Sequence, residues 1–487
     1  KALLLLTVVL CFGCEKTLDI NTSPNNPPID AATPEVLFPS ATFSTAGRVG
    51  GELGIIGSFW SQFWTQSNAS NQYKTIDAYN LQKTDYNGNY NELFGGALSD
   101  YQLAITKAVA REDWRYNLMC TAMKVYTYEV LVDLYDQVPY SEAFQGQANL
   151  QPKFEDGYTV YIGLLAELDA ALAKDYKSIA LSTDQKKTDF IFAGDMNKWE
   201  QFANTLKLKM YLRMVNAKPA EAQAGINALY TAGTNFLTVS AGITAFTDVP
   251  DGSNPAYEYN IRRLNTTTNI RASITFTSFL AANSDPRAAS YFGTASPIGI
   301  HQGDFTATLT AQPTYANATT ALQKATDPVW FISAAESNFM QAEALERYYA
   351  GAGAKAKYDA GVTAAFAQVG LTPDTLIAAG GKYEYPAAGT FQQKLQAIIT
   401  QKWASMPGSH GLEAFFEQER TGYPLISPVY STDASYAGSH AGEWVYSKNG
   451  ATSGKFPKRL VFPASERDRN KNTPSEVPIY TKVWWGL

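Results

Sequence analysis

The stretch from Trp114 to Phe144 limits the folds open to this chain more than any other part of the sequence. Between Leu118 and Tyr135, apolar side chains cover most of the circumference that a helix would present, which is the pattern of a buried helix. The charged exceptions lie four and three residues apart and would share one narrow stripe: Glu129, Asp133 and Asp136. A long buried helix with one polar stripe predicts an α-helical array around it.

The end of this helix is predicted at Pro139. Proline lacks an N–H group and disfavours helical geometry in the residue before it. The acidic stripe would then support the turn beside the helix end. Two of its members, Asp133 and Asp136, are one turn apart, and we expect capping or pairing with Arg or Lys rather than catalysis there.

Helical periodicity recurs along much of the chain, whereas two regions lack it. Helices are predicted at 33–47, 52–67, 91–111, 157–174, 199–217, 219–232, 333–349, 354–368 and 390–406. Residues 236–328 are rich in Thr, Asn, Gly and Pro, with one helix near 271–282, and residues 424–487 are mostly loop. Paired helices with short turns favour a tetratricopeptide-like arrangement, although no strict 34-residue repeat is present.

Charge and composition exclude one class of partner. The formal net charge is −6 and the pI is near 5.3, whereas nucleic-acid binding requires clustered Lys and Arg. Aromatic residues make up 13% of the chain, which suits sugar stacking or large interfaces, although core packing accounts for most of them. We therefore expect no nucleic-acid partner.

The first fourteen residues have the pattern of an export signal. Lys1 is followed by an apolar run to Phe12 that is too short to span a bilayer. Gly13 then precedes Cys14, as in a bacterial lipobox, although Cys11 stands three places before Cys14 where Leu is usual. Residues 1–14 are predicted to be a lipoprotein signal with Cys14 lipidated, each buried methylene adding about 0.8 kcal/mol. An ordinary secretory signal or a buried strand are the alternatives.

Residues 15–32 are predicted to be a tether, because they have turn chemistry and no periodicity. A single α-helical domain is predicted for 33–487. Cys120 is then the one thiol left in the domain, and we interpret it as a small core residue.

A polar segment rich in Asn and Tyr follows the predicted helix at 52–67. Flat aromatic faces and amide groups together suit a carbohydrate or a peptide. A long surface loop is the alternative interpretation. The candidate ligand-binding residues are Trp64, Asn68, Asn71, Tyr73 and Tyr79, with Tyr257 and Tyr259 as secondary choices.

Signatures of catalysis are missing from the sequence. It has no His-Glu-x-x-His, Gly-x-Ser-x-Gly or P-loop pattern. His301 lies near Asp304, but two residues do not make a metal site. We expect no catalytic residues, no cofactor and no metal.

Several motifs resemble one family across nearly the whole chain. Asn21-Thr22-Ser23-Pro24-Asn25-Asn26-Pro27 after a lipobox resembles the start of SusD/RagB outer-membrane lipoproteins of Bacteroidetes. Residues 131–144 resemble the family's Leu-x-Asp-x-Tyr-Gly-x-x-Pro-Tyr-x-Glu-Ala motif, with Asp136 where Gly is common. Further matches lie in order at 198–213, 285–287, 335–344, 401–403, 413–424, 459–470 and 484–485.

The resemblance implies a mainly α fold in which tetratricopeptide-like helix pairs form a right-handed superhelical scaffold, with an irregular ligand-facing half. It also implies a SusC-like TonB-dependent barrel as partner, which the lipid-anchored protein would close at the cell surface as a lid. The ligand would be a nutrient, an oligosaccharide or a peptide. A structural subunit of an outer-membrane complex with no ligand of its own is the alternative function.

Overall fold

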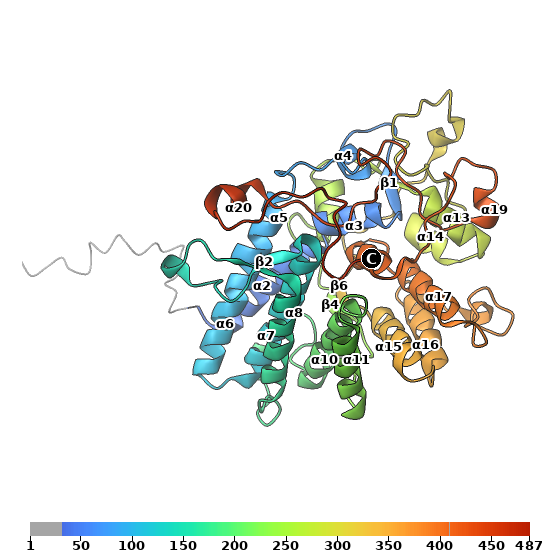
Figure 1. The fold of residues 1–487 in the computed structure, drawn as a ribbon. Coiled ribbons are helices and arrows are strands. Elements are labelled where there is room, and N and C mark those ends of the chain that lie inside the picture. The colour runs from blue at the N-terminus through green and yellow to red at the C-terminus, as the bar shows by residue number, and fades with distance from the viewer. Residues whose placement is uncertain (1–31, 409) are drawn as a thin grey trace, which may run out of the picture.

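The computed structural model describes residues 32–408 and 410–487, and their fold is mainly α, as predicted. Figure 1 shows long helices side by side along the lower half of the molecule and short elements and loops along the upper half. Successive long helices pack as pairs in a tetratricopeptide-like arrangement, for example α15 (Ala334–Tyr348) with α16 (Ala354–Ala367). The predicted division into a helical scaffold and an irregular half is confirmed.

The other long helices occupy most of the segments that the sequence predicts. They are α2 (Pro34–Val49), α3 (Glu52–Trp60), α6 (Ser99–Ala110), α7 (Trp114–Tyr135), α8 (Gly157–Leu172), α10 (Met196–Arg213), α11 (Pro219–Thr231), α13 (Ile274–Ala282), α17 (Phe391–Ala404) and α18 (Gly411–Thr421). The shorter helices are α4 (Lys74–Asp77), α5 (Asn87–Asn91), α9 (Thr183–Lys186), α12 (Pro255–Tyr257), α14 (Arg287–Phe292), α19 (Tyr436–Ser439) and α20 (Ala464–Arg469). Two π-helices, η2 (Glu92–Leu98) and η4 (Glu258–Arg262), and the 3₁₀ turns η3 (Gly146–Ala148), η5 (Pro313–Asn317) and η6 (Asp374–Leu376) complete the set.

Strands of the described residues are short and pair as three antiparallel two-stranded sheets. In the first, β1 (Trp64–Gln66) pairs with β5 (Ile270–Ala272). In the second, β2 (Gln137–Pro139) pairs with β3 (Phe154–Asp156). In the third, β4 (Ala241–Ile243) pairs with β6 (Val329–Ile332). The second sheet joins the end of α7 to the start of α8, whereas the other two join segments far apart in the chain.

Helix α7 lies at the centre of the array, as predicted, but it ends differently. Asp113 caps its first turn by accepting from Tyr116 N, and Tyr116 to Tyr135 are all buried. The helix stops at Asp136, whose φ of 70° leaves the helical region. Pro139 lies three residues later in β2, so the predicted stop at Pro139 is wrong. The left-handed φ also explains why glycine is common at this place in the family motif.

The helix predicted at 52–67 is too long. Helix α3 ends at Trp60, and Gln62 has a φ of 59° that a helix cannot contain. The chain then runs into β1, where Trp64 faces Ala272. Likewise, the first part of the helix predicted near 271–282 is strand β5. The aromatic residues between Ile55 and Phe63 are all buried.

The acidic stripe of α7 faces a buried network of ion pairs. Arg213 on α10 donates to Asp133 at 2.9 Å, and its guanidinium also reaches Glu129 at 3.3 Å. The same guanidinium donates to Glu413 at 2.7 Å and to Glu417 at 2.8 Å on α18. All of these side chains are buried. The stripe is therefore part of the scaffold, as predicted, and it joins three helices.

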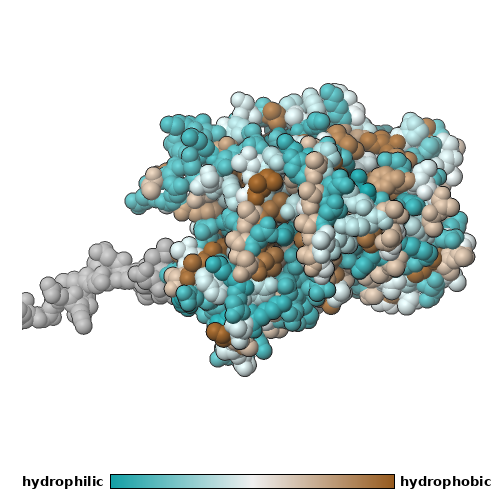
Figure 2. Space-filling model, turned by 60° about the horizontal axis from the view of Figure 1, so that its bottom comes forward, coloured by the Kyte–Doolittle hydropathy of each residue, from teal (hydrophilic) through white to brown (hydrophobic). Residues whose placement is uncertain are grey.

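On the face of the molecule that Figure 2 shows, hydrophobic residues form separate patches between hydrophilic ones. Among the described residues, no helix has the length and apolar character needed to cross a membrane. Cys120 is buried in α7, as predicted. The predicted signal segment, Cys14 and most of the tether lie outside the described residues.

Candidate functional site

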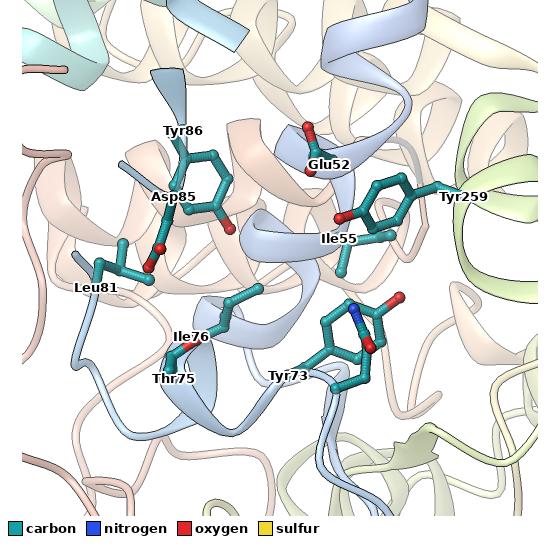
Figure 3. A pocket seen from close by; sticks show the side chains of 10 residues that line it. Glu52, Ile55, Tyr73, Thr75, Ile76, Leu81, Asp85, Tyr86 and Tyr259 are labelled. Carbon is teal, nitrogen blue, oxygen red and sulfur yellow. The ribbon is translucent and has the colours of Figure 1, made fainter. Parts of the chain in front are cut away.

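A small cavity on the loop-rich side of the molecule brings three tyrosines together, and we name it the tyrosine pocket (Figure 3). Its volume is about 190 Å³. The lining residues are Glu52, Ile55, Gln72, Tyr73, Thr75, Ile76, Leu81, Asp85, Tyr86 and Tyr259. Aromatic faces, carboxylates and an amide thus meet in one concave site, which is the composition of a small-molecule site.

Three parts of the chain build the tyrosine pocket. Helix α3 supplies Glu52 and Ile55, the segment from Gln72 to Tyr86 supplies most of the wall, and η4 supplies Tyr259. The long segment between α3 and α5 is held in place by Asp77 of α4. Its carboxylate accepts from Thr65 Oγ1 at 2.7 Å and from the backbone N of Gln66 at 2.8 Å. The pocket wall is therefore anchored on β1.

Tyr73 is fixed by two hydrogen bonds. Its backbone N donates to Gln66 Oε1 at 2.6 Å, and its hydroxyl donates to Asn260 Oδ1 at 2.8 Å. Only 3% of its surface is exposed, and its ring packs against Phe59 with centroids 5.5 Å apart. Tyr73 therefore offers a rigid aromatic wall, which costs little conformational entropy on binding.

Tyr86 and Tyr259 contribute polar groups to the pocket. Figure 3 shows their hydroxyls pointing toward one another across the cavity, with Glu52 near Tyr259. Tyr86 is only 8% exposed, and no described residue forms a hydrogen bond with its hydroxyl. Burial and the nearby Glu52 carboxylate raise the pKa of Tyr259 to about 12. Both hydroxyls therefore remain protonated at neutral pH. The Tyr259 hydroxyl is hydrogen-bonded to Glu52, whereas the Tyr86 hydroxyl is available as a donor.

Several other polar groups of the tyrosine pocket are not used inside the protein. No hydrogen bond to a described residue engages the side chains of Gln72 and Thr75, which line the pocket. Asp85 accepts only from the backbone N of Gln82, at 2.8 Å on one carboxylate oxygen. Gln72, Thr75 and Asp85 are exposed, so these groups meet solvent in the pocket and are free to bind a ligand.

A larger cavity of about 510 Å³ lies elsewhere, and we name it the tryptophan pocket after Trp64 and Trp330 in its wall. Trp64 is only 4% exposed. Many of the polar groups in this wall already have partners: Asn254 caps α12, Tyr291 donates to Ala404 O at 3.1 Å, and Ser405 donates to Lys402 O at 2.6 Å. The tryptophan pocket is larger, and some of its polar groups also lack partners among the described residues, for example Gln323 Nε2.

A third cavity, also of about 510 Å³, adjoins the tyrosine pocket, and we name it the arginine groove after Arg48 and Arg263. It lies between α2, the start of α3 and residues 246–263. Glu52 and Tyr259 line both cavities. A ligand longer than one ring in the tyrosine pocket can therefore extend into the arginine groove.

The structure separates the residues that the sequence proposes as ligand contacts. Tyr73 and Tyr259 meet in the tyrosine pocket, whereas Trp64 lies in the tryptophan pocket. The remaining candidates line none of the three cavities: Asn68, Asn71, Tyr79 and Tyr257.

Three of these residues make contacts inside the protein. Tyr79 is 2% exposed and packs against Tyr446 and Phe456, because its φ of 56° turns its side chain into the core. Asn68 donates to Ala307 O at 3.3 Å. Tyr257 lies under the guanidinium of Arg262, 5.5 Å from the ring centroid.

Glu52, Asp85 and Tyr86 are pocket residues that the sequence analysis does not select. Tyr86 is in the same Asn- and Tyr-rich segment as Tyr73, so composition signals the segment but not the residue. Glu52 is the first residue of a helix whose sequence pattern indicates core packing. Its position beside Tyr259 follows from a contact between segments about two hundred residues apart.

Comparison with known proteins places the chain in a family. Residues 26–440 match the model of the SusD-like family described as starch-binding and associating with the outer membrane. A search of curated proteins finds no match.

Solved structures share the fold at low sequence identity. A SusD homolog from Bacteroides uniformis matches with a TM-score of 0.72 and 21% identity over 93% of this chain and 99% of that one. A chitin-binding SusD homolog from Flavobacterium johnsoniae matches with a TM-score of 0.72 and 21% identity, over 92% of this chain and 98% of that one. A SusD homolog from Bacteroides fragilis matches with a TM-score of 0.73 and 17% identity, over 93% of this chain and 99% of that one.

The family model covers most of the described residues, and the solved homologs cover nearly the whole fold. The predicted resemblance is confirmed. The chain belongs to the SusD-like family of outer-membrane-associated binding proteins.

Proposed function

We propose that this protein is a cell-surface lipoprotein that binds an oligosaccharide in the tyrosine pocket and acts as the lid of a SusC-like TonB-dependent importer. In this proposal residues 1–14 are the signal, Cys14 carries the lipid, residues 15–32 are a tether and 33–487 form one binding domain. The protein binds and delivers its ligand without catalysing a reaction.

The observation that carries the binding proposal is the set of polar groups without protein partners in the tyrosine pocket. A pyranose has an apolar face that stacks on an aromatic ring and hydroxyls that need donors and acceptors. Tyr73 offers a rigid ring, Tyr86 offers a hydroxyl without a protein partner, and Gln72 offers both donor and acceptor. The Tyr259 hydroxyl is bonded to Glu52, and its oxygen can still accept. The starch-binding description of the family and the chitin-binding homolog support a glycan over a peptide.

The binding proposal is tested with the purified chain from residue 15 onward, titrated calorimetrically with panels of oligosaccharides and of peptides. We expect saturable binding to at least one oligosaccharide and a loss of about fivefold or more in affinity for Tyr259→Ala, since truncating an aromatic anchor costs more than about 1 kcal/mol. The matched control is Tyr349→Ala, a half-buried tyrosine that packs on Tyr230 and lines none of the three cavities.

The panel also separates the proposal from its alternatives. Binding to a peptide and to no saccharide would replace the ligand class. No binding to either panel would favour a structural subunit of an outer-membrane complex. The partnership is tested by capture of the full-length lipoprotein from its native membrane, where an outer-membrane barrel is expected to copurify and its absence would contradict the lid role.

A further inference from the structure

The charged residues that line the tyrosine pocket are all acidic. The lining includes the carboxylates of Glu52 and Asp85 and no Lys or Arg. Among the described residues, no cation lies within ion-pair distance of Asp85. The nearest lysines in sequence do not compensate for it, because Lys74 lies over the Phe305 ring, 5.5 Å from its centroid, and Lys83 is outside the lining.

Glu52 is only partly neutralised. Its Oε2 accepts from Asn89 Nδ2 at 2.9 Å and lies 3.6 Å from Arg48 Nη1. Arg48 is shared, because its other terminal nitrogen lies 3.9 Å from Glu92. One guanidinium is thus shared by two carboxylates. The negative charge of Glu52 acts on the pocket, where it contributes to the raised pKa of Tyr259.

The aromatic walls favour the same kind of ligand. Tyr73, Tyr86 and Tyr259 surround the space beside the two carboxylates (Figure 3). A cation that meets tyrosine faces in a partly desolvated site gains cation–π attraction in addition to ion pairing. The Tyr86 hydroxyl, buried, without a partner and aimed into the cavity, completes the polar contacts. A ligand with its own carboxylate would instead meet like charge.

We propose that the tyrosine pocket selects a protonated amino group, so that the ligand is an oligosaccharide containing non-acetylated 2-amino sugars. This inference rests on the proposed function. The pocket volume of about 190 Å³ takes one sugar ring, and the ring's ammonium group lies between Glu52 and Asp85. The next sugars continue past Glu52 and Tyr259 into the arginine groove, where each carboxylate in the wall has an arginine partner.

The test compares ligands that differ only in the charge of the amine. The purified chain from residue 15 onward is titrated at about pH 6, where such amines are protonated, with a glucosamine oligomer, its fully N-acetylated counterpart, a galacturonate oligomer and oligolysine. We expect the glucosamine oligomer to bind at least about tenfold more tightly than the acetylated one, with no binding of the galacturonate oligomer. The preference should shrink as salt is raised, because the contact is ionic.

Two carboxamide variants locate the effect. Asp85→Asn and Glu52→Gln are each expected to weaken glucosamine-oligomer binding about tenfold and to weaken binding of the acetylated oligomer by a clearly smaller factor, so that the preference for the amine falls. The control is Asp184→Asn, whose carboxylate is 92% exposed and lines none of the three cavities. Because Asp85 is exposed, its variant is expected to unfold at the same temperature as the wild type, which calorimetry checks.

The outcomes distinguish this inference from the proposed function. Equal or tighter binding of the acetylated or galacturonate oligomer, with sensitivity to Tyr259→Ala, overturns the amine preference and leaves the glycan site standing. Binding of oligolysine without the glucosamine oligomer overturns the sugar assignment. If none of the saccharides binds, the proposed function fails together with this inference.

Discussion

The Nε of Arg213 donates to Asp133 Oδ2 at 2.9 Å, although the two residues are 80 positions apart in the chain. The other oxygen of Asp133 accepts from Tyr161 at 2.6 Å and from Trp485 Nε1 at 2.7 Å. Both Arg213 and Asp133 are buried. One carboxylate therefore joins α7, α8, α10 and the C-terminal end of the chain, which makes this pair the centre of the scaffold that positions the binding face.

Removing Arg213 should destabilise the protein strongly. Arg213→Ala leaves the carboxylates of Asp133, Glu413 and Glu417 buried without the guanidinium that pairs with them. Removing one partner of a buried ion pair in this way lowers the free energy of unfolding by about 3–5 kcal/mol. Urea unfolding measures the loss. As a control, Lys355→Ala breaks a surface pair with Asp359 and should change the free energy of unfolding by less than about 0.5 kcal/mol. Similar small effects for both variants would contradict the central role of Arg213.

Acid should weaken the fold through Glu413 and Glu417. Burial alone would raise the pKa of Glu413, but Arg213, Lys209 and Lys402 outweigh it and hold the pKa well below the usual range. In the same way, Arg420 and Lys402 lower the pKa of Glu417 against the effect of burial. A lowered folded-state pKa means that the stabilisation is fully present above the unfolded value of 4.5 and is lost as the pH falls through the folded value.

The pH dependence is measured as the free energy of unfolding between about pH 7 and about pH 3. We expect Glu413 and Glu417 to cause a decline below about pH 4.5, whereas buried acids with raised pKa values, such as Asp77 at about 6, act in the opposite direction above it. Glu417→Gln should be less stable at neutral pH and decline less steeply, because one of the depressed groups is gone. Equally steep declines of the wild type and Glu417→Gln below about pH 4.5 would contradict the account.

Helices α3 and α18 pack so closely at Gly57 that an added side chain has no room. A Cβ at Gly57 would lie 2.2 Å from Leu412 N and 2.4 Å from Leu412 Cα, which are backbone atoms. Gly57→Ala should therefore cost about 2 kcal/mol or more through overpacking. Gly47→Ala is the control within α2, where a Cβ meets nothing within 4 Å, and it should be neutral or stabilising by about 0.5–1 kcal/mol.

A loss at both glycines, or at neither, would contradict this reading of the helix contact. Thermal or urea unfolding of the two variants in parallel gives the comparison. Because Gly57 lies one turn after Glu52 in α3, the same variant also reports on the tyrosine pocket, which α3 helps to build.

Asp136 holds the end of α7 with its side chain as well as its backbone. Its Oδ1 accepts from Trp484 N at 2.6 Å, and Oδ2 lies 3.7 Å from Arg459 Nη1. Its φ of 70° strains any residue other than glycine. Asp136→Ala keeps the strain and loses both contacts, so we expect a cost of about 1–2 kcal/mol. In Asp136→Gly the relief of strain offsets part of that loss.

The comparison of the two variants tests which effect dominates. We expect the glycine variant to be more stable than the alanine variant by about 0.5–1 kcal/mol, measured by urea unfolding. Equal stability would mean that the left-handed backbone carries no strain, and it would remove the reason for glycine in the family motif.

The helical half of the fold is predictable because its signals are local. Apolar periodicity predicts α7, α10, α15 and α16 within a few residues, since each helix buries one face against its neighbours. The prediction is wrong at Trp64 and at Arg271, where two short strands meet across about two hundred residues. Pairing of this kind depends on distant segments, and a single window of sequence does not contain it.

The candidate site is less predictable for a related reason. The Asn- and Tyr-rich segment is visible in the composition of the sequence. Within it, Tyr79 has a positive φ and its side chain is buried in the core, whereas Tyr86 lines the pocket. Glu52 joins the pocket only because α3 packs beside η4. Side-chain direction in a loop follows from backbone geometry and distant contacts, so residue type alone does not distinguish a wall of the pocket from a part of the core.

The most direct test of the central claim is a crystal structure of the chain from residue 15 onward with the tightest-binding oligosaccharide of the panel. The account predicts a sugar ring in the tyrosine pocket, stacked on a tyrosine and in contact with Tyr86 and Tyr259. A saccharide bound instead in the tryptophan pocket beside Trp330, with the tyrosine pocket empty, would contradict it.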